Sequence, residues 1–170
     1  VTLSGGEVLA QWRFALELLR QLGRRDLHTA VETSGCGPWE HVRLIAEACD
    51  LVLYDLKHMD DAEHRKHTGV SNKLILENAR RLAQVDVQLV FRIPLIGGIN
   101  TDSGNIEAAA AFALETGVRE VHLLPFHRLG ESKYERLHRE YRCEGYTPDD
   151  ETVEGIRKQL ESHGLRVKVG

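Results

Sequence analysis

Short apolar runs alternate along this chain with longer segments in which apolar residues recur every three or four positions. The short runs are typical of β-strands, and the longer segments are typical of helices with one apolar face. Strands are predicted at Val1–Leu3, His28–Glu32, Leu51–Leu56, Val85–Pro94, Glu120–Leu124 and Arg166–Val169. Helices are predicted at Leu9–Leu22, after Pro38, at Lys73–Leu82, at Ile106–Leu114, and from Pro148 to about His163.

The segments between these elements carry weaker signals. Thr147-Pro148-Asp149-Asp150 predicts a helix start with proline in the first helical position, and Gly164 predicts its end. The polar stretch His58–Ser71 shows no helical or strand periodicity. Two loops, Gly97–Asn100 and Gly130–Tyr141, are long enough to border a site or to close over it.

Strands that alternate with helices predict an α/β fold with a parallel sheet and right-handed crossovers. Five or six strands are too few for a closed eight-stranded barrel, so both an open sheet and an incomplete (β/α) barrel satisfy the pattern. No low-complexity linker interrupts the chain, and residues 1–170 are expected to form a single domain.

Five of the apolar runs end in polar or charged residues. Because the carboxyl ends of parallel strands meet at one edge of a sheet, these side chains are expected to converge. The residues are Glu7, Glu32, Asp55, Lys57, Arg92 and His127. One charged strand end is ordinary, whereas five in succession predict the mouth of an active site.

Composition narrows the classes of partner. The net charge of −4 and the pI near 6.1 argue against a nucleic-acid surface built on bulk positive charge. No apolar run approaches the roughly 20 residues of a membrane span, so no membrane partner is expected. The scattered Cys36, Cys49 and Cys143 indicate the reducing cytoplasm rather than a disulfide scaffold or a metal cassette. A chain that begins at Val1, inside a strand pattern, is expected to be a piece of a larger protein.

The charged strand ends together suit a zwitterion that carries an additional positive centre. Asp55 and Lys57 lie two residues apart, which places both side chains on one side of a strand. Arg92 follows an apolar run and therefore needs an anionic partner. The carboxylates could meet an amine or sulfonium, while Lys57 or Arg92 could meet a carboxylate. Taken singly, the motifs are weak: Gly5-Gly6 also suits a plain strand-to-helix turn, and a lone His127 also suits a structural role.

Six motifs occur in an order that resembles the radical S-adenosylmethionine enzymes that activate glycyl-radical enzymes, with pyruvate formate-lyase activating enzyme as the type member. They are Thr2–Glu7 (TLSGGE), Glu32–Gly35 (ETSG), Asp55–Asp60 (DLKHMD), His67–Asn72 (HTGVSN), Leu123–Gly130 (LLPFHRLG) and Lys133-Tyr134. The resemblance implies a partial (β/α) TIM-like barrel whose first strand is missing here. It further implies a [4Fe–4S] cluster, S-adenosylmethionine, and a 5′-deoxyadenosyl radical that takes the α-hydrogen of a glycine.

The resemblance also implies partners and residue roles. The partners are a pyruvate formate-lyase-like glycyl-radical enzyme and a flavodoxin or ferredoxin-type reductant. The implied catalytic residues are Lys57, Arg92 and His127. The implied cofactor-binding residues are Gly5, Gly6, Glu7, Glu32, Thr33, Asp55, Lys57 and His127. The two glycines, Glu7, Glu32 and Thr33 would lie near the amino group of S-adenosylmethionine. Asp55 and Lys57 would lie at its ribose and carboxylate ends.

Two departures from the family pattern matter. Val8 stands where the family's Gly-Gly-Glu-Pro motif has proline, and the chain contains no C-x₃-C-x₂-C motif. Since a thiolate-held cluster needs its cysteines, the cluster segment and first strand are expected upstream. This chain alone is expected to be inactive and to contain no metal ligands.

Two alternatives stay open. One is a metal-dependent barrel hydrolase or isomerase with Glu32, Asp55 and His127 as ligands. The other is a non-catalytic module, derived from the same fold, that binds a partner protein.

Overall fold

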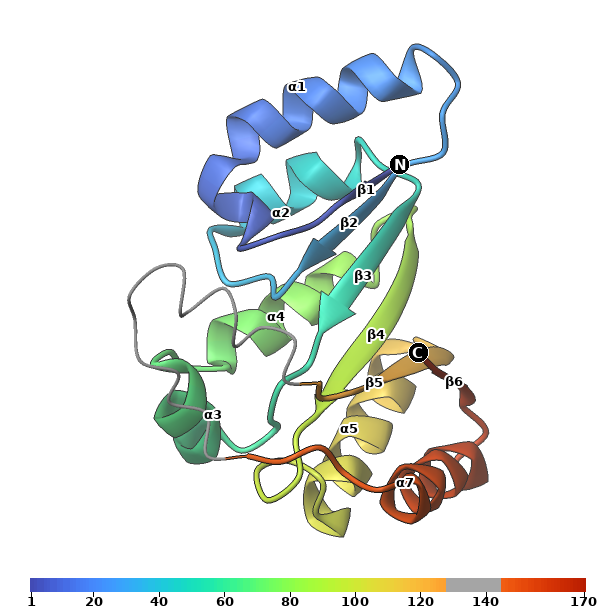
Figure 1. The fold of residues 1–170 in the computed structure, drawn as a ribbon. Coiled ribbons are helices and arrows are strands. Elements are labelled where there is room, and N and C mark those ends of the chain that lie inside the picture. The colour runs from blue at the N-terminus through green and yellow to red at the C-terminus, as the bar shows by residue number, and fades with distance from the viewer. Residues whose placement is uncertain (128–144) are drawn as a thin grey trace.

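The computed structural model describes residues 1–127 and 145–170, and within them it shows a six-stranded parallel sheet (Figure 1). The strands lie side by side in the order in which they occur in the chain. Their bounds are β1 (Thr2–Leu3), β2 (Ala30–Thr33), β3 (Leu51–Asp55), β4 (Gln88–Leu95), β5 (Glu120–Pro125) and β6 (Arg166–Val169). Because the order never reverses, the sheet winds in one direction, as in part of a (β/α) barrel.

The connections between the strands are helical. They are η1 (Val8–Gln11), α1 (Trp12–Gly23), α2 (Trp39–Ala46), α3 (Asp61–Thr68), α4 (Lys73–Leu82), α5 (Ser103–Thr116) and α7 (Asp150–Ser162). Figure 1 shows α2, α4 and α5 on one side of the sheet and α3 beyond the carboxyl end of β3. Among the described residues, no helix is long and apolar enough to cross a membrane.

The core lies between the sheet and its covering helices, and strand alternation decides which side chains enter it. Tyr54, Phe91 and Ile93 are almost fully buried, and the Phe91 ring stacks on Phe112 of α5 with centroids 5.6 Å apart. Asp55 and Arg92 alternate with these residues and therefore point to the opposite face. The same alternation that builds the core thus directs charged groups away from the helices.

Two helices differ from the sequence prediction at their start. The Leu9–Leu22 segment begins with the 3-10 turn η1, because Glu7 caps it by accepting a hydrogen bond from the Leu9 amide at 3.2 Å. The prediction of Pro148 in the first helical position is wrong. Asp149 is the N-cap of α7 and accepts from the Thr152 amide at 2.8 Å, so proline lies outside the helix.

The polar stretch after His58 contains α3, which the apolar pattern did not predict. Only His64 of this helix is buried. The helix ends carry the signal instead: Asp60 accepts from the Ala62 and Glu63 amides, and Gly69 ends the helix with a φ of 80°. Strand β4 likewise begins three residues after the predicted Val85, because the Val85 amide bonds to Leu82 and closes a turn. The predicted loop Gly130–Tyr141 lies outside the described residues.

Candidate functional site

The carboxyl ends of β1 and β2 are joined through Glu7. One oxygen of this carboxylate accepts from the Thr33 hydroxyl at 2.6 Å, and the other accepts from the Ser34 hydroxyl at 2.6 Å and from its amide at 3.0 Å. Both Glu7 oxygens therefore have protein partners, and the carboxylate fixes the two loops against each other. Thr33 is buried and also accepts from the Gly35 amide at 3.0 Å.

Gly5 and Gly6 form an open turn directly before Glu7. Their φ values are +94° and +61°, a region that favours glycine. A Cβ atom on either residue would meet no heavy atom within 4 Å. The turn therefore presents main-chain groups to free space, where a small ligand can approach them closely.

Arg92 lies between two carboxylates on the side of the sheet away from the helices. Its guanidinium is 2.7 Å from Glu32 and 2.8 Å from Asp55, its register partner on β3. The Ser4 hydroxyl donates to the second Glu32 oxygen at 2.5 Å. The prediction that Arg92 has an anionic partner is thus confirmed, and the partners are carboxylates of this chain.

The pKa values of the two carboxylates that contact Arg92 shift in opposite directions. Burial raises the pKa of Asp55, and the attraction of Arg92 only partly opposes this effect. Burial acts in the same direction on Glu32, but the hydrogen bonds from Ser4 and Arg92 outweigh it and lower the pKa of Glu32. At neutral pH, Glu32 is therefore the more firmly ionised partner of Arg92.

Replacing Asp55 by asparagine is expected to change how stability depends on pH. Because its pKa is raised in the folded chain, wild-type Asp55 makes the free energy of unfolding fall as pH rises above about 3.8. Asp55→Asn abolishes that fall, so its stability relative to wild type should increase between pH 3.5 and 6. Urea unfolding at both pH values measures this difference.

Asp61→Asn provides a control of opposite sign. The Ser71 hydroxyl, together with Arg65, lowers the pKa of Asp61 to about 2. The stabilising contribution of Asp61 to the free energy of unfolding is present above about pH 3.8 and is lost as pH falls toward 2. Asp61→Asn should therefore lose stability relative to wild type as pH rises. If the stability of the two variants relative to wild type changed with pH in the same way, the opposite pKa shifts of Asp55 and Asp61 would be contradicted.

The strand ends enclose a hollow of about 220 Å³. It is lined by Ser4, Gly5, Gly6, Glu7, Glu32, Thr33, Ser34, Asp55, Lys57 and Arg92. The structure thus brings together every predicted site residue except His127, which is exposed two residues beyond β5 and is absent from this lining. Ser4 and Ser34 were missed as individual residues, although both lie inside the quoted motifs next to the strand ends.

Lys57 differs from Arg92, because among the described residues it has no ion-pair partner. It is exposed, and none of the described carboxylates forms an ion pair with its ammonium within 4.0 Å. A cation that borders a hollow and forms no ion pair with the described carboxylates is suited to bind an anionic ligand group. The acidic and cationic groups therefore differ in role: Glu32 and Asp55 are held by Arg92, whereas Lys57 is available.

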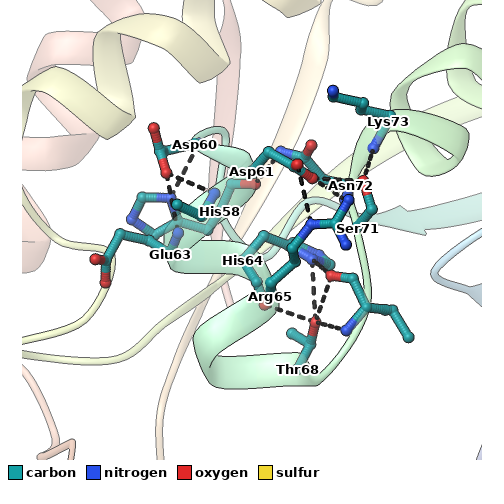
Figure 2. Close-up of polar contacts among 12 residues, drawn as sticks. His58, Asp60, Asp61, Glu63, His64, Arg65, Thr68, Ser71, Asn72 and Lys73 are labelled. Atoms are coloured by element: carbon teal, nitrogen blue, oxygen red, sulfur yellow. Dashed lines mark hydrogen bonds and ion pairs between the residues drawn. The ribbon is translucent and has the colours of Figure 1, made fainter.

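The motif residues that follow Lys57 hold α3 in place (Figure 2). The side-chain nitrogen of Asn72 donates to the carbonyls of His58 and Met59 at 3.1 and 2.7 Å. Asp61 accepts from the Ser71 hydroxyl at 2.5 Å. His64 Nδ1 lies 2.8 Å from the Val70 carbonyl. These contacts are structural, and they fix the segment that leaves the candidate site.

The described residues do not form a metal or iron–sulfur centre. Within residues 1–127 and 145–170, no three His, Cys, Asp or Glu side chains are placed to hold a metal ion. The predicted triad of Glu32, Asp55 and His127 is not assembled, because Arg92 binds both carboxylates. Burial raises the pKa of Cys49 to about 12, which disfavours the thiolate that a cluster requires. Cys143 lies outside the described residues.

An unreversed parallel sheet with charged groups around a hollow at its carboxyl ends defines an enzyme-like partial (β/α) barrel. Residues 1–110 match the sequence profile of the radical SAM superfamily. The chain belongs to this superfamily and, within it, to the glycyl-radical-enzyme activating enzymes. The resemblance drawn from the motifs is confirmed.

Three similar proteins support this assignment. Trans-4-hydroxy-L-proline dehydratase activating enzyme of Clostridioides difficile is 36% identical over 100% of this chain and 58% of its own length. Isethionate sulfite-lyase activating enzyme of Nitratidesulfovibrio vulgaris is 44% identical over 90% of this chain and 50% of its own. A domain of pyruvate-formate lyase-activating enzyme from Bacteroides vulgatus superposes with a TM-score of 0.82 at 34% identity, covering 100% of this chain and 98% of that one. The chain spans about half the length of these curated relatives.

Proposed function

We propose that this chain is the S-adenosylmethionine-binding part of a glycyl-radical-enzyme activase, an oxidoreductase that takes a hydrogen atom from a glycine of its partner. One observation carries the proposal. In a member of this family, the exposed ammonium of Lys57, the acidic groups of Glu32 and Asp55, and the open turn Gly5-Gly6 surround one hollow.

The lining fits the amino-acid end of S-adenosylmethionine. A hollow of about 220 Å³ is smaller than the roughly 300–1,000 Å³ of sites that enclose a whole small molecule. Lys57 is assigned to the carboxylate, and Glu32 and Asp55 to the amine and sulfonium side. Gly5 and Gly6 present main-chain groups, while Glu7 and Thr33 hold the turn in place.

Arg92 orients the two carboxylates and favours their ionised forms before any ligand binds. When bound beside a reduced [4Fe–4S] cluster, S-adenosylmethionine supplies a carbon radical able to take the α-hydrogen of glycine. The described cysteines do not fit such a cluster, and we assign it to a C-x₃-C-x₂-C segment outside these 170 residues. His127 stays a prediction, as a residue that completes the pocket and reaches toward the glycine.

The partner is proposed as a glycyl-radical enzyme. The similar proteins are named as activating enzymes of a dehydratase, a sulfite-lyase and pyruvate formate-lyase, and these names support that class. A pyruvate formate-lyase-like partner, a flavodoxin or ferredoxin-type reductant, a single domain and a cytoplasmic location stay predictions.

Replacing Lys57 by methionine is expected to weaken binding of S-adenosylmethionine about 10- to 100-fold, the effect of losing one hydrogen bond to a charged group. Isothermal titration calorimetry of the 170-residue chain measures this change. Lys158→Met, on the exposed face of α7, is the matched control and should bind as wild type does. S-adenosylhomocysteine, which lacks the positive sulfur, should bind more weakly than S-adenosylmethionine to wild type and to the Lys158→Met control.

Activity is tested on a protein that joins this chain to a C-x₃-C-x₂-C segment, reconstituted anaerobically with iron and sulfide. We expect 5′-deoxyadenosine release under reduction and a glycyl radical in the partner, detected by electron paramagnetic resonance. Changing the cysteines to alanine should abolish both signals. An iron-loaded protein that releases no 5′-deoxyadenosine would refute the activase and leave a binding module.

A further inference from the structure

A buried asparagine joins the main chain of Lys57 to the end of β4. Asn100 is 1% exposed. Its side-chain nitrogen donates to the carbonyls of Lys57 and Pro94 at 2.9 and 2.6 Å. Its side-chain oxygen accepts from the Ile96 amide at 2.8 Å. One side-chain amide therefore connects Lys57 to the strand that carries Arg92.

This connection is placed where the sheet no longer fixes the backbone. Strand β3 ends at Asp55, and the Leu56 amide donates to the Arg92 carbonyl at 2.8 Å. The carbonyl of Lys57, two residues beyond the strand, is bonded by Asn100 instead of by a neighbouring strand. Because a lysine side chain has four flexible carbons, the point from which it starts determines where its ammonium can reach.

A second asparagine supports the first. Asn105, in the first turn of α5, donates to the Asn100 carbonyl at 2.9 Å and accepts from the Met59 amide at 2.8 Å. Asn105 is itself held by the N-cap Asp102, which accepts from its amide at 2.9 Å. The backbone from Lys57 to Met59 is thus held at both ends by side chains from beyond β4.

We propose that Asn100 is a positioning residue for Lys57, and that it directs the lysine ammonium toward the carboxylate of the bound ligand. Asn105 supports this position by holding the main chain of Asn100. The assignment rests on the proposed function, because it needs a ligand carboxylate at Lys57. It predicts that the two asparagines contribute to binding only when that carboxylate and that ammonium are both present.

The test compares S-adenosylmethionine with its decarboxylated analogue by isothermal titration calorimetry. Asn100→Ala is expected to weaken binding of S-adenosylmethionine about five- to tenfold, within the range of coupling between contacting residues. Binding of the decarboxylated analogue should change less than twofold. In a Lys57→Met chain, the effect of Asn100→Ala on S-adenosylmethionine binding should disappear.

Asn78→Ala is the matched control. Asn78 is equally buried and donates to the carbonyls of Gly35 and Gly37 at 2.9 and 2.8 Å, in the loop after β2. Its loss also removes a side-chain donor from two carbonyls, of which that of Gly35 still accepts from the Gly37 amide at 2.9 Å, but any effect on binding should be the same for both ligands. Should Asn100→Ala fail to fold by circular dichroism, Asn105→Ala replaces it, with the same expected dependence on the carboxylate.

The outcomes separate this inference from the proposed function. Equal weakening of both ligands by Asn100→Ala, or an unchanged effect in the Lys57→Met chain, would overturn the positioning role. If wild type binds both ligands alike and Lys57→Met has no effect, the proposed site of the carboxylate is itself wrong, and the inference fails with it.

Discussion

Replacing Arg92 by methionine is expected to lower the free energy of unfolding by about 3–5 kcal/mol at pH 7, the typical cost of removing one partner from a buried ion pair. The Arg92 side chain is only 11% exposed and holds Glu32 and Asp55 at 2.7 and 2.8 Å. Methionine fills similar volume but leaves two neighbouring carboxylates without a counter-ion. Urea unfolding followed by circular dichroism measures the loss.

The pH dependence of this loss identifies its origin. Without Arg92, both carboxylates bind protons more tightly in the folded chain, so the loss should shrink as pH falls toward 4. Arg157→Met is the control, because Arg157 pairs with Glu154 and Glu161 on the surface of α7 and such pairs contribute about 0–1 kcal/mol. Similar losses in the two variants would show that the Arg92 ion pairs do not stabilise the fold.

Replacing Gly35 by alanine is expected to cost about 3–5 kcal/mol, from backbone strain and steric overlap together. Its φ of +69° lies in the left-handed region, where any residue with a Cβ is strained. A Cβ atom there would also overlap the ring of Tyr54. That ring cannot move easily, since it is fully buried and its hydroxyl donates to the Ile75 carbonyl at 2.6 Å.

Gly37→Ala tests the explanation within the same loop. Its Cβ would approach only the flexible end of the Leu9 side chain, at 3.2 Å, and its φ is not positive. We expect a loss below about 1 kcal/mol, as for substitutions without a named cause of strain. Thermal unfolding of both variants provides the comparison, and a Gly35→Ala chain as stable as Gly37→Ala would contradict the close contact with Tyr54.

The sequence allowed the sheet to be predicted because each strand has a strong local signal. Strand β6 was predicted at its observed bounds because apolar and charged residues alternate along it, and α4 because its apolar periodicity places Ile75, Ala79 and Leu82 in the core. Helix α3 has no such periodicity, since hydrogen bonds rather than apolar contacts hold it. The start of α7 was misplaced because the residue pattern of Thr147–Asp150 does not show which side chain reaches a free amide, and the structure shows that Asp149 does.

The candidate site was predicted as a set of residues, but the partner of each was not. Arg92 was expected to need an anion, and only the register between β3 and β4 shows that Asp55 lies opposite it. Glu7 was expected near a ligand, whereas the structure shows both of its oxygens bonded to Thr33 and Ser34. Motifs identify which residues gather at the strand ends, while their pairing depends on three-dimensional distances.

Three of the buried asparagines, Asn72, Asn100 and Asn105, have a consequence for how this site can change. They hold the segments that border the site through main-chain carbonyls, which every residue type possesses, and through amides, which only proline lacks. The exposed side chains on those segments therefore do not support the frame of the site. They can be exchanged to suit a different partner surface at little cost in stability, so one frame can serve several partner specificities.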